Sequence, residues 1–201
     1  MASEVDVCNL ALARLGDTAT VASISPPEGS AQAEHCARFY PMARDALLEL
    51  HAWGFATRRV AMPTLSGDTH GWGFAYAGAN DAVRLLGVLP PHAPANGDSQ
   101  PYEVVSREGA VPIVLTDQSN AELLYVALVV DTVAYSPLFV DALAWLLASH
   151  LAGVLLKGSS GAQMAVQCYQ RFAVAFGQAR ASDANQRRVR SEHTPAWIAA
   201  R

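Results

Sequence analysis

Two aspartates are the side chains of this sequence with the clearest potential for chemistry. Asp45 and Asp141 both lie in segments with helical spacing, and two carboxylates that converge can act as a general acid and a general base. A catalytic carboxyl group usually needs an apolar pocket that perturbs its pKa, and nothing in the sequence marks such a pocket around either residue. We therefore expect surface or interface acids, or a salt bridge from Asp45 to a neighbouring arginine.

The histidines and one cysteine offer a second possibility. His35 and Cys36 follow Glu34 directly, but adjacent residues on a helix point in different directions and cannot work together. His150 lies on an apolar helix, and a metal site needs three or four convergent ligands. We expect His150 to be a hydrogen-bonded core or interface histidine.

Known catalytic motifs are missing from the sequence. It has no dinucleotide-binding glycine fingerprint, no phosphate loop, no H-E-x-x-H and no G-x-S-x-G. Gly71 and Gly73 have the spacing of glycines in a phosphate-binding loop, but no helical pattern follows them, and such a loop needs a helix whose N-terminus binds the phosphate. Cys8, Cys36 and Cys168 are isolated, which argues against a disulfide framework or a zinc site and favours buried apolar positions. We expect no cofactor, no metal and no enzymatic activity.

The only basic cluster lies near the C-terminus. Arg187, Arg188 and Arg190 are followed by Trp197 and Ile198. Tryptophan and arginine dominate the hot spots of protein interfaces, so we interpret this segment as a docking tail. A short nucleic-acid-binding arm and an idle solvated tail remain alternatives.

Composition limits the class of protein. The chain has 201 residues, of which 51% are hydrophobic and 16% charged, with a net charge of -4. These values describe a folded chain with no electrostatic reason to bind nucleic acid tightly. The first residues lack a basic region followed by an apolar one, so we expect synthesis in the cytoplasm without a secretory signal.

One long apolar segment, Ser136 to Lys157, must organise the other elements. It is apolar on nearly every face, which is typical of a helix buried among others or in a membrane. Asp141, Ser149 and His150 interrupt it and no basic cluster flanks it, so we predict a central core helix. The expected structural core consists of Trp53, Phe55, Phe139, Leu143, Leu146, Leu147 and Leu151.

Three further helices are expected, over Glu4 to Leu15, Ser30 to His51 and Ser159 to Ala181. Ser3 is the expected cap of the first helix, and Pro41 predicts a bend or a break in the second. The last helix takes its apolar positions from Met164, Val166, Cys168, Tyr169, Phe172, Val174 and Phe176.

Between the second and third of these helices the pattern changes to short strands. Tyr102 to Ser106 and Ala110 to Leu115 predict a hairpin. The further expected strands are Phe55 to Ala61, Val83 to Leu89 and Leu123 to Val130. The sequence thus predicts an α+β fold: a four-helix bundle (residues 1–54 and 132–182), a small antiparallel β domain inserted between helices two and three (55–131), and an extended C-terminal docking tail (183–201).

Several segments resemble one known family in the right order along most of the chain. They are Cys8 to Gly16, Ala33 to Tyr40, Arg44 to Leu48, His51 to Ala56, Tyr102 to Val104 and Tyr135 to Ala144. This ordered set is similar to the tail tubular protein A family, the head-to-tail adaptors of short-tailed bacteriophages. The chain departs from the family at Ala52, where proline is common, and at Gly54, where asparagine is common.

The resemblance implies a structural virion protein of the phage neck, not a membrane protein. About twelve copies would form a ring through head-to-tail contacts. The ring would lie between the portal protein and the tail nozzle protein, with double-stranded DNA passing through its centre without sequence-specific binding, and the C-terminal tail would reach the portal. The alternatives are a tail-associated cell-wall hydrolase that uses Asp45, Asp141 and the histidines, and a generic helical interaction module.

Overall fold

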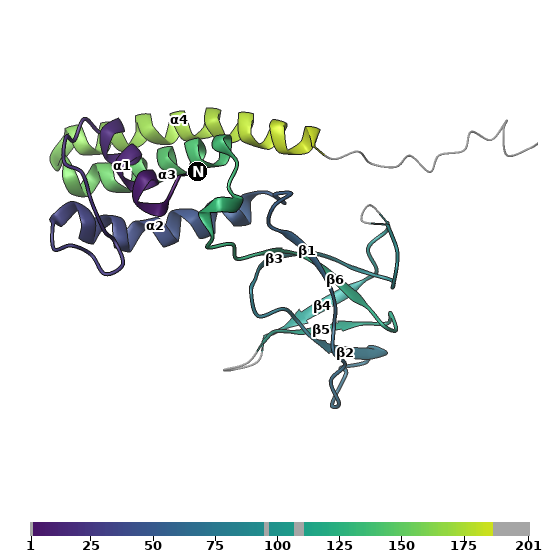
Figure 1. Cartoon of the computed structure of the whole chain (residues 1–201). Helices are drawn as coiled ribbons and strands as arrows, with labels where there is room; N and C mark the ends of the chain where they lie inside the picture. Colours follow the sequence, from purple (N-terminus) through teal and green to yellow (C-terminus); the bar gives the residue numbers. More distant parts are fainter. Residues whose placement is uncertain (1, 95–96, 107–110, 187–201) are drawn as a thin grey trace, which may run out of the picture.

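The computed structural model describes residues 2–94, 97–106 and 111–186. It has a helical part and a β part joined by short crossings (Figure 1). The helical part contains α1 (Glu4–Arg14), α2 (Ala31–Leu50), α3 (Pro137–Leu155) and α4 (Gly158–Asn185), and a 3₁₀ turn, η1 (Thr132–Ala134), precedes α3. The β part contains β1 (Thr57–Ala61), β2 (Phe74–Ala77), β3 (Ala82–Leu89), β4 (Tyr102–Val105), β5 (Ile113–Thr116) and β6 (Glu122–Ala127).

Serine side chains start the first three helices. Ser3 accepts a hydrogen bond from the backbone N–H of Asp6, whose carboxylate accepts one in return from the N–H of Ser3, so the predicted cap of α1 is confirmed. The side chains of Ser30 and Ser136 cap α2 and α3 by accepting from the backbone N–H groups of Ala33 and Phe139, without a reciprocal bond. Such caps satisfy backbone N–H groups that have no partner within the helix.

The helix α3 is the centre of the helical part. It packs against α1, α2 and, most extensively, α4, and nine of its side chains are buried. By length and composition it is, within the described part of the chain, the one helix that could cross a membrane. Burial against three other helices accounts for its apolar character in this fold.

The expectation of a four-helix bundle carrying one small sheet is wrong. In a regular bundle each helix packs against two neighbours. Here α1, α2 and α4 all pack on α3 because α3 is apolar on nearly every side, while α1 touches α2 only slightly. The helices flank the strands in sequence, and the strands form two three-stranded antiparallel sheets in place of a single sheet.

The two sheets pack face to face. One has the order β1-β6-β3 and the other β2-β5-β4. The predicted hairpin is confirmed, since β4 and β5 pair antiparallel with Val104 opposite Val114. The strand β2 was missed, because the glycines before it favour a loop. A small apolar core of Tyr76, Val88, Val114, Leu123 and Tyr125 lies between the sheets.

The second predicted helix runs unbroken through Pro41. α2 extends from Ala31 to Leu50 with the proline inside it. An interior proline removes one backbone hydrogen bond, and the burial of seven α2 side chains offsets that loss. The break allowed by the sequence is therefore absent.

Candidate functional site: the outer face of α4

The two aspartates considered as catalytic acids are both held by arginines. Asp45 accepts a hydrogen bond from Nε of Arg44 at 2.7 Å, which confirms the predicted salt bridge. Asp141 is paired with the guanidinium of Arg14, which also donates to the Asp141 backbone carbonyl at 2.9 Å. Burial lowers the pKa of Arg14, and Asp141 acts in the opposite direction. The Arg14–Asp141 pair joins α1 to α3, whereas the Arg44–Asp45 pair lies within α2. Neither carboxylate lies in an apolar pocket of its own.

Arg14 also lies over an aromatic ring. Its guanidinium carbon is 4.1 Å from the centroid of the Trp145 ring, a geometry that favours attraction between the cation and the ring face. Arg14 therefore joins α1 to α3 through both an ion pair and a ring contact.

The histidines of α2 and α3 belong to an aromatic contact. The ring of Phe39 lies 6.4 Å from that of His35 and 6.2 Å from that of His150. Cys36 lies beside Cys8 of α1: the neighbouring Cys36 thiol, together with burial, raises the pKa of the Cys8 thiol. His35 and Cys36 therefore do not form a pair. All three cysteines are free and buried, as the sequence predicts.

The burial of His150 gives a prediction about pH. Burial lowers the pKa of His150 below its ordinary value, so the unfolded chain binds a proton more readily than the folded one. The free energy of unfolding should therefore be fully retained above about pH 6.5 and fall as the pH drops below it. Urea unfolding at pH 7.5 and pH 5.5 should show a smaller difference for His150→Gln than for the unchanged protein.

Acidic side chains should contribute little to the change in stability between pH 7.5 and pH 5.5. Glu122 has its pKa lowered mainly by its hydrogen bond from Arg59, and its contribution is lost at a lower pH than that of His150. If the unchanged protein and His150→Gln lost the same free energy of unfolding between pH 7.5 and pH 5.5, the role given to His150 would be contradicted.

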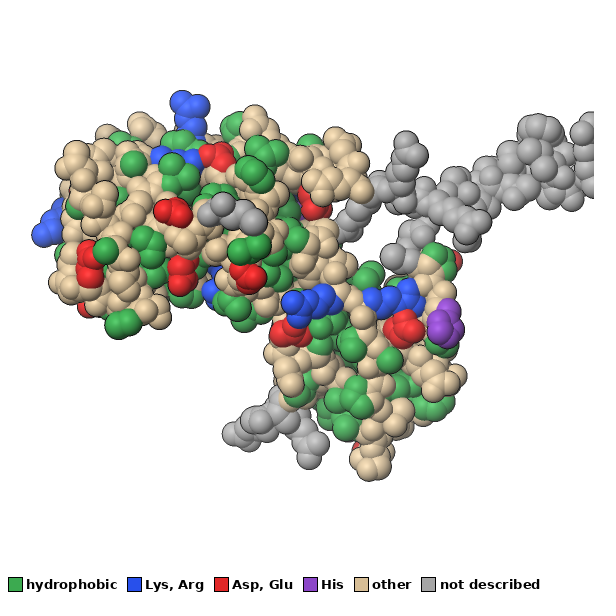
Figure 2. Space-filling view, in the orientation of Figure 1, with side chains coloured by type: hydrophobic (Ala, Val, Ile, Leu, Met, Phe, Trp, Pro, Cys, Tyr) green, Lys and Arg blue, Asp and Glu red, His purple; other side chains and the backbone are tan. Residues whose placement is uncertain are grey.

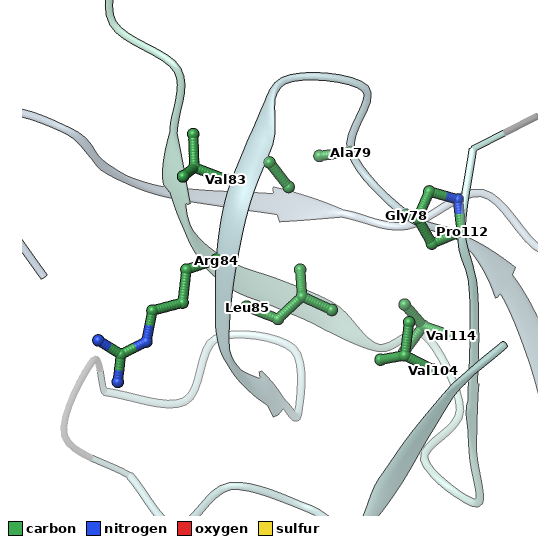
Figure 3. A pocket seen from close by; sticks show the side chains of 9 residues that line it. Gly78, Ala79, Val83, Arg84, Leu85, Val104, Pro112 and Val114 are labelled. Carbon is green, nitrogen blue, oxygen red and sulfur yellow. The ribbon is translucent and has the colours of Figure 1, made fainter. Parts of the chain in front are cut away.

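No described residues form a group of three or more histidines, cysteines, aspartates or glutamates that could hold a metal ion. One hollow of about 180 Å³ lies in the β part. Figure 3 shows Leu85, Val104 and Val114 lining it from three strands, with Arg84 extending away from them. Arg84 donates to the backbone carbonyl of Glu49 at 3.2 Å. The hollow is therefore lined mainly by apolar groups and contains no pair of titratable side chains.

The outer face of α4 is the most distinctive surface among the described residues. Cys168, Phe172 and Ala175 are buried against the rest of the helical part. Val166, Tyr169 and Val174, in contrast, are 58%, 57% and 61% exposed. The sequence interpretation assigned all the apolar residues of this helix to its packed side, and for these three that was wrong.

This face of α4 is nearly free of charge. From Gly158 to Gln178 the helix carries one charged residue, Arg171, and no carboxylate. Polar groups on the face are glutamines at positions 163, 167, 170 and 178. An exposed helix face normally carries charged residues, whereas the centre of a protein interface is depleted in them and enriched in aromatic residues and arginine.

Shallow hollows follow the same face. One of about 510 Å³ is lined by Ala162, Gln163, Val166, Gln167 and Gln170. A second of about 340 Å³ is lined by Gln167, Gln170, Arg171 and Val174. A third of about 380 Å³ lies between α4 and α3 and is lined by Asp141, Trp145, Arg171, Val174, Ala175 and Gln178. These hollows are shallow and open to solvent, and they follow α4 over about five helical turns.

Acidic side chains lie elsewhere on the helical part. In Figure 2 most of them lie below the upper edge, which α4 forms in the same orientation in Figure 1. Exposed carboxylates include Glu4 and Asp6 on α1 and Glu34 and Glu49 on α2. The helical part thus presents a side with few charges, along α4, and a more acidic side.

The last turn of α4 contacts the segment that connects α2 of the helical part to β1 of the β part. Asp183 accepts a hydrogen bond from the backbone N–H of Gly54 at 2.8 Å, and its other oxygen lies 3.0 Å from Nε2 of His51. A side chain at position 54 would bring its Cβ to 3.1 Å from Asp183, which accounts for glycine here. α4 runs through the boundary expected at residue 183.

The predicted core residues lie around this crossing and in α3. Phe55 is half-buried and its ring centroid is 5.0 Å from that of Phe139. The other six, Trp53, Phe139, Leu143, Leu146, Leu147 and Leu151, are buried. The predicted docking residues Arg187, Arg188, Arg190, Trp197 and Ile198 lie outside the described residues.

Compared with models of known protein families and with curated proteins, the chain matches none.

Proposed function

We propose that this chain is a structural ring subunit, the head-to-tail adaptor of a short-tailed bacteriophage. The observation that carries the proposal is the outer face of α4, which exposes apolar side chains and carries Arg171 as its single charged residue up to Gln178. Such a face is suited to burial against protein. The ordered sequence resemblance to tail tubular protein A supplies the identity of the ring. In this role the protein is a component of the virion neck between the portal and the tail nozzle.

The arrangement of surfaces supports a ring more than a two-fold dimer. Rings need two different surfaces that meet head to tail, whereas two-fold dimers use one surface twice. α2 and α4 lie on opposite sides of α3 (Figure 1). Both carry exposed apolar side chains, among them Met42 on α2 and Val174 on α4. The helical part therefore offers two distinct surfaces for neighbouring copies.

The charge of the chain supports a conduit for DNA. A net charge of -4 per copy, repeated around a ring, repels the phosphate backbone and lets it slide without being held. The ion-paired states of Asp45 and Asp141 agree with a protein that has no catalytic role.

Mixing the purified protein with the portal protein of the virus that encodes it tests this function. We expect ring-shaped complexes in electron microscopy and a discrete increase in mass by mass photometry. The free protein can remain monomeric, since adaptors of this kind can assemble on the portal alone. Failure to bind the portal at any concentration would overturn the proposal.

The C-terminal segment gives a separate prediction. Deleting residues 187–201 leaves Asp183 and its contacts in place, so the melting temperature should change little. Affinity for the portal should fall at least about tenfold if the arginines and Trp197 are hot spots. Trp197→Ala alone should reproduce a large part of that loss. Replacement of Arg187, Arg188 and Arg190 by lysine retains the charge of the segment and serves as the control for its net charge. Equal portal affinity with and without the segment would refute the docking role.

A further inference from the structure

Two exposed ridges run along opposite sides of the helical part. In each, residues four apart in sequence follow one another along the helix surface. The α4 ridge consists of Ala162, Val166, Gln170, Val174 and Gln178, and the α2 ridge consists of Glu34, Arg38, Met42, Ala46 and Leu50; all ten are exposed. Each ridge covers 16 residue steps, or about 24 Å of helix.

We propose that the α4 ridge of one copy packs against the α2 ridge of the next copy around the ring. The inference rests on the proposed function, because it names the contact by which the ring forms. Ridges of residues four apart fit into the grooves beside similar ridges on a facing helix. The small residues Ala162 and Ala46 leave room for the valines and for Met42, which is 57% exposed in the single copy.

Charge selects α2 as the partner of α4. The outer face of α4 carries Arg171 and no carboxylate as far as Gln178. Two α4 faces paired about a two-fold axis would bring two arginines into one interface, and the acid beside each of them, Asp141, is already paired with Arg14. The exposed side of α2 carries Arg38 together with Glu34 and Glu49. The carboxylate of Asp45 is still 44% exposed beside Arg44, so acidic groups are in excess on this side. Opposite signs across an interface favour one partner and suppress others.

The position of the two ridges allows the same contact to repeat from one copy to the next. α2 and α4 both pack on α3, from different sides, and have no extensive contact with each other. A copy bound through its α4 ridge therefore still has a free α2 ridge. Such a contact continues from copy to copy until the ring closes, whereas contact of one surface with itself ends at a dimer.

Cysteine cross-linking tests the contact directly. Cys8, Cys36 and Cys168 are buried, so Met42→Cys and Gln170→Cys place the only accessible thiols on the two ridges of the described chain. Portal-bound rings of the double variant, treated with a bis-maleimide, should give a ladder of covalent multimers. Rings mixed from the two single variants should give dimers only. Val60→Cys, at a 43% exposed position on β1, measures background cross-linking.

The outcomes separate this inference from the proposed function. Normal rings without cross-links above the Val60→Cys background would overturn the α4–α2 contact and leave the ring intact. Dimers from Gln170→Cys alone, as abundant as from the mixture, would show that α4 pairs with itself. Absence of rings for the unchanged protein would overturn both. Circular dichroism of each variant before assembly confirms that the substitutions leave the fold unchanged.

Discussion

Replacing Val166 and Val174 together by glutamate should abolish ring assembly on the portal while leaving the single copy folded. Both side chains are more than half exposed, so their loss costs the isolated fold little. In the assembly, two carboxylates would be buried in an interface with Arg171 as the nearest available cation on α4. We expect the assembled fraction, measured by mass photometry, to fall at least about tenfold, as at an interface hot spot.

A matched control adds the same charge elsewhere. Ser66 and Ser119 are exposed in loops of the β part, and Ser66→Glu with Ser119→Glu changes the net charge equally. Rings should form from this variant at the same protein concentration as from the unchanged chain. If the control and the α4 variant assemble equally well, the α4 face is not the contact surface.

Among the substitutions proposed for this chain, Trp53→Ala should cause the largest decrease in the free energy of unfolding. The side chain is 1% exposed, its indole N–H donates to the backbone carbonyl of Leu47 at 2.8 Å, and its ring meets that of Phe139 edge to face at 4.9 Å. Truncation of a buried tryptophan leaves a cavity and costs about 3–5 kcal/mol, a large part of the ~5–15 kcal/mol that holds a typical domain folded.

Urea unfolding followed by circular dichroism measures this loss. Trp53→Phe should cost less than Trp53→Ala, because the smaller ring fills part of the cavity, although the indole hydrogen bond to Leu47 is lost. Phe74→Ala, at a position 37% exposed on β2, provides the comparison for an aromatic residue outside the core. A loss below about 1 kcal/mol for Trp53→Ala would contradict the central role given to this residue.

The helices could be predicted closely because their signals are local. The serine caps at Ser3 and Ser136 depend on residues within one turn of the chain, and α3 is apolar over its whole length. The β4–β5 hairpin was equally accessible, because its strands are separated by a short turn-rich segment.

The sheet arrangement and the outer face of α4 could not be read from local pattern. β6 pairs with β1 and β3, which are distant in sequence, and strand pairing across such distances leaves no periodic signal. Val166 and Val174 have the composition of core residues. Their exposure follows from the direction in which α4 packs on α3. The one sequence signal for this face is the row of uncharged residues spaced four apart from Ala162 to Gln178.

The bond between Asp183 and Gly54 determines where a pull on the end of the chain is felt. Tension applied beyond Gln186 is transmitted through the last turn of α4 to the backbone of Gly54 and the ring of His51. The load thus arrives at the joint of the helical and β parts before it reaches the centre of either. A tether attached there would therefore act first on the connection between α2 and β1.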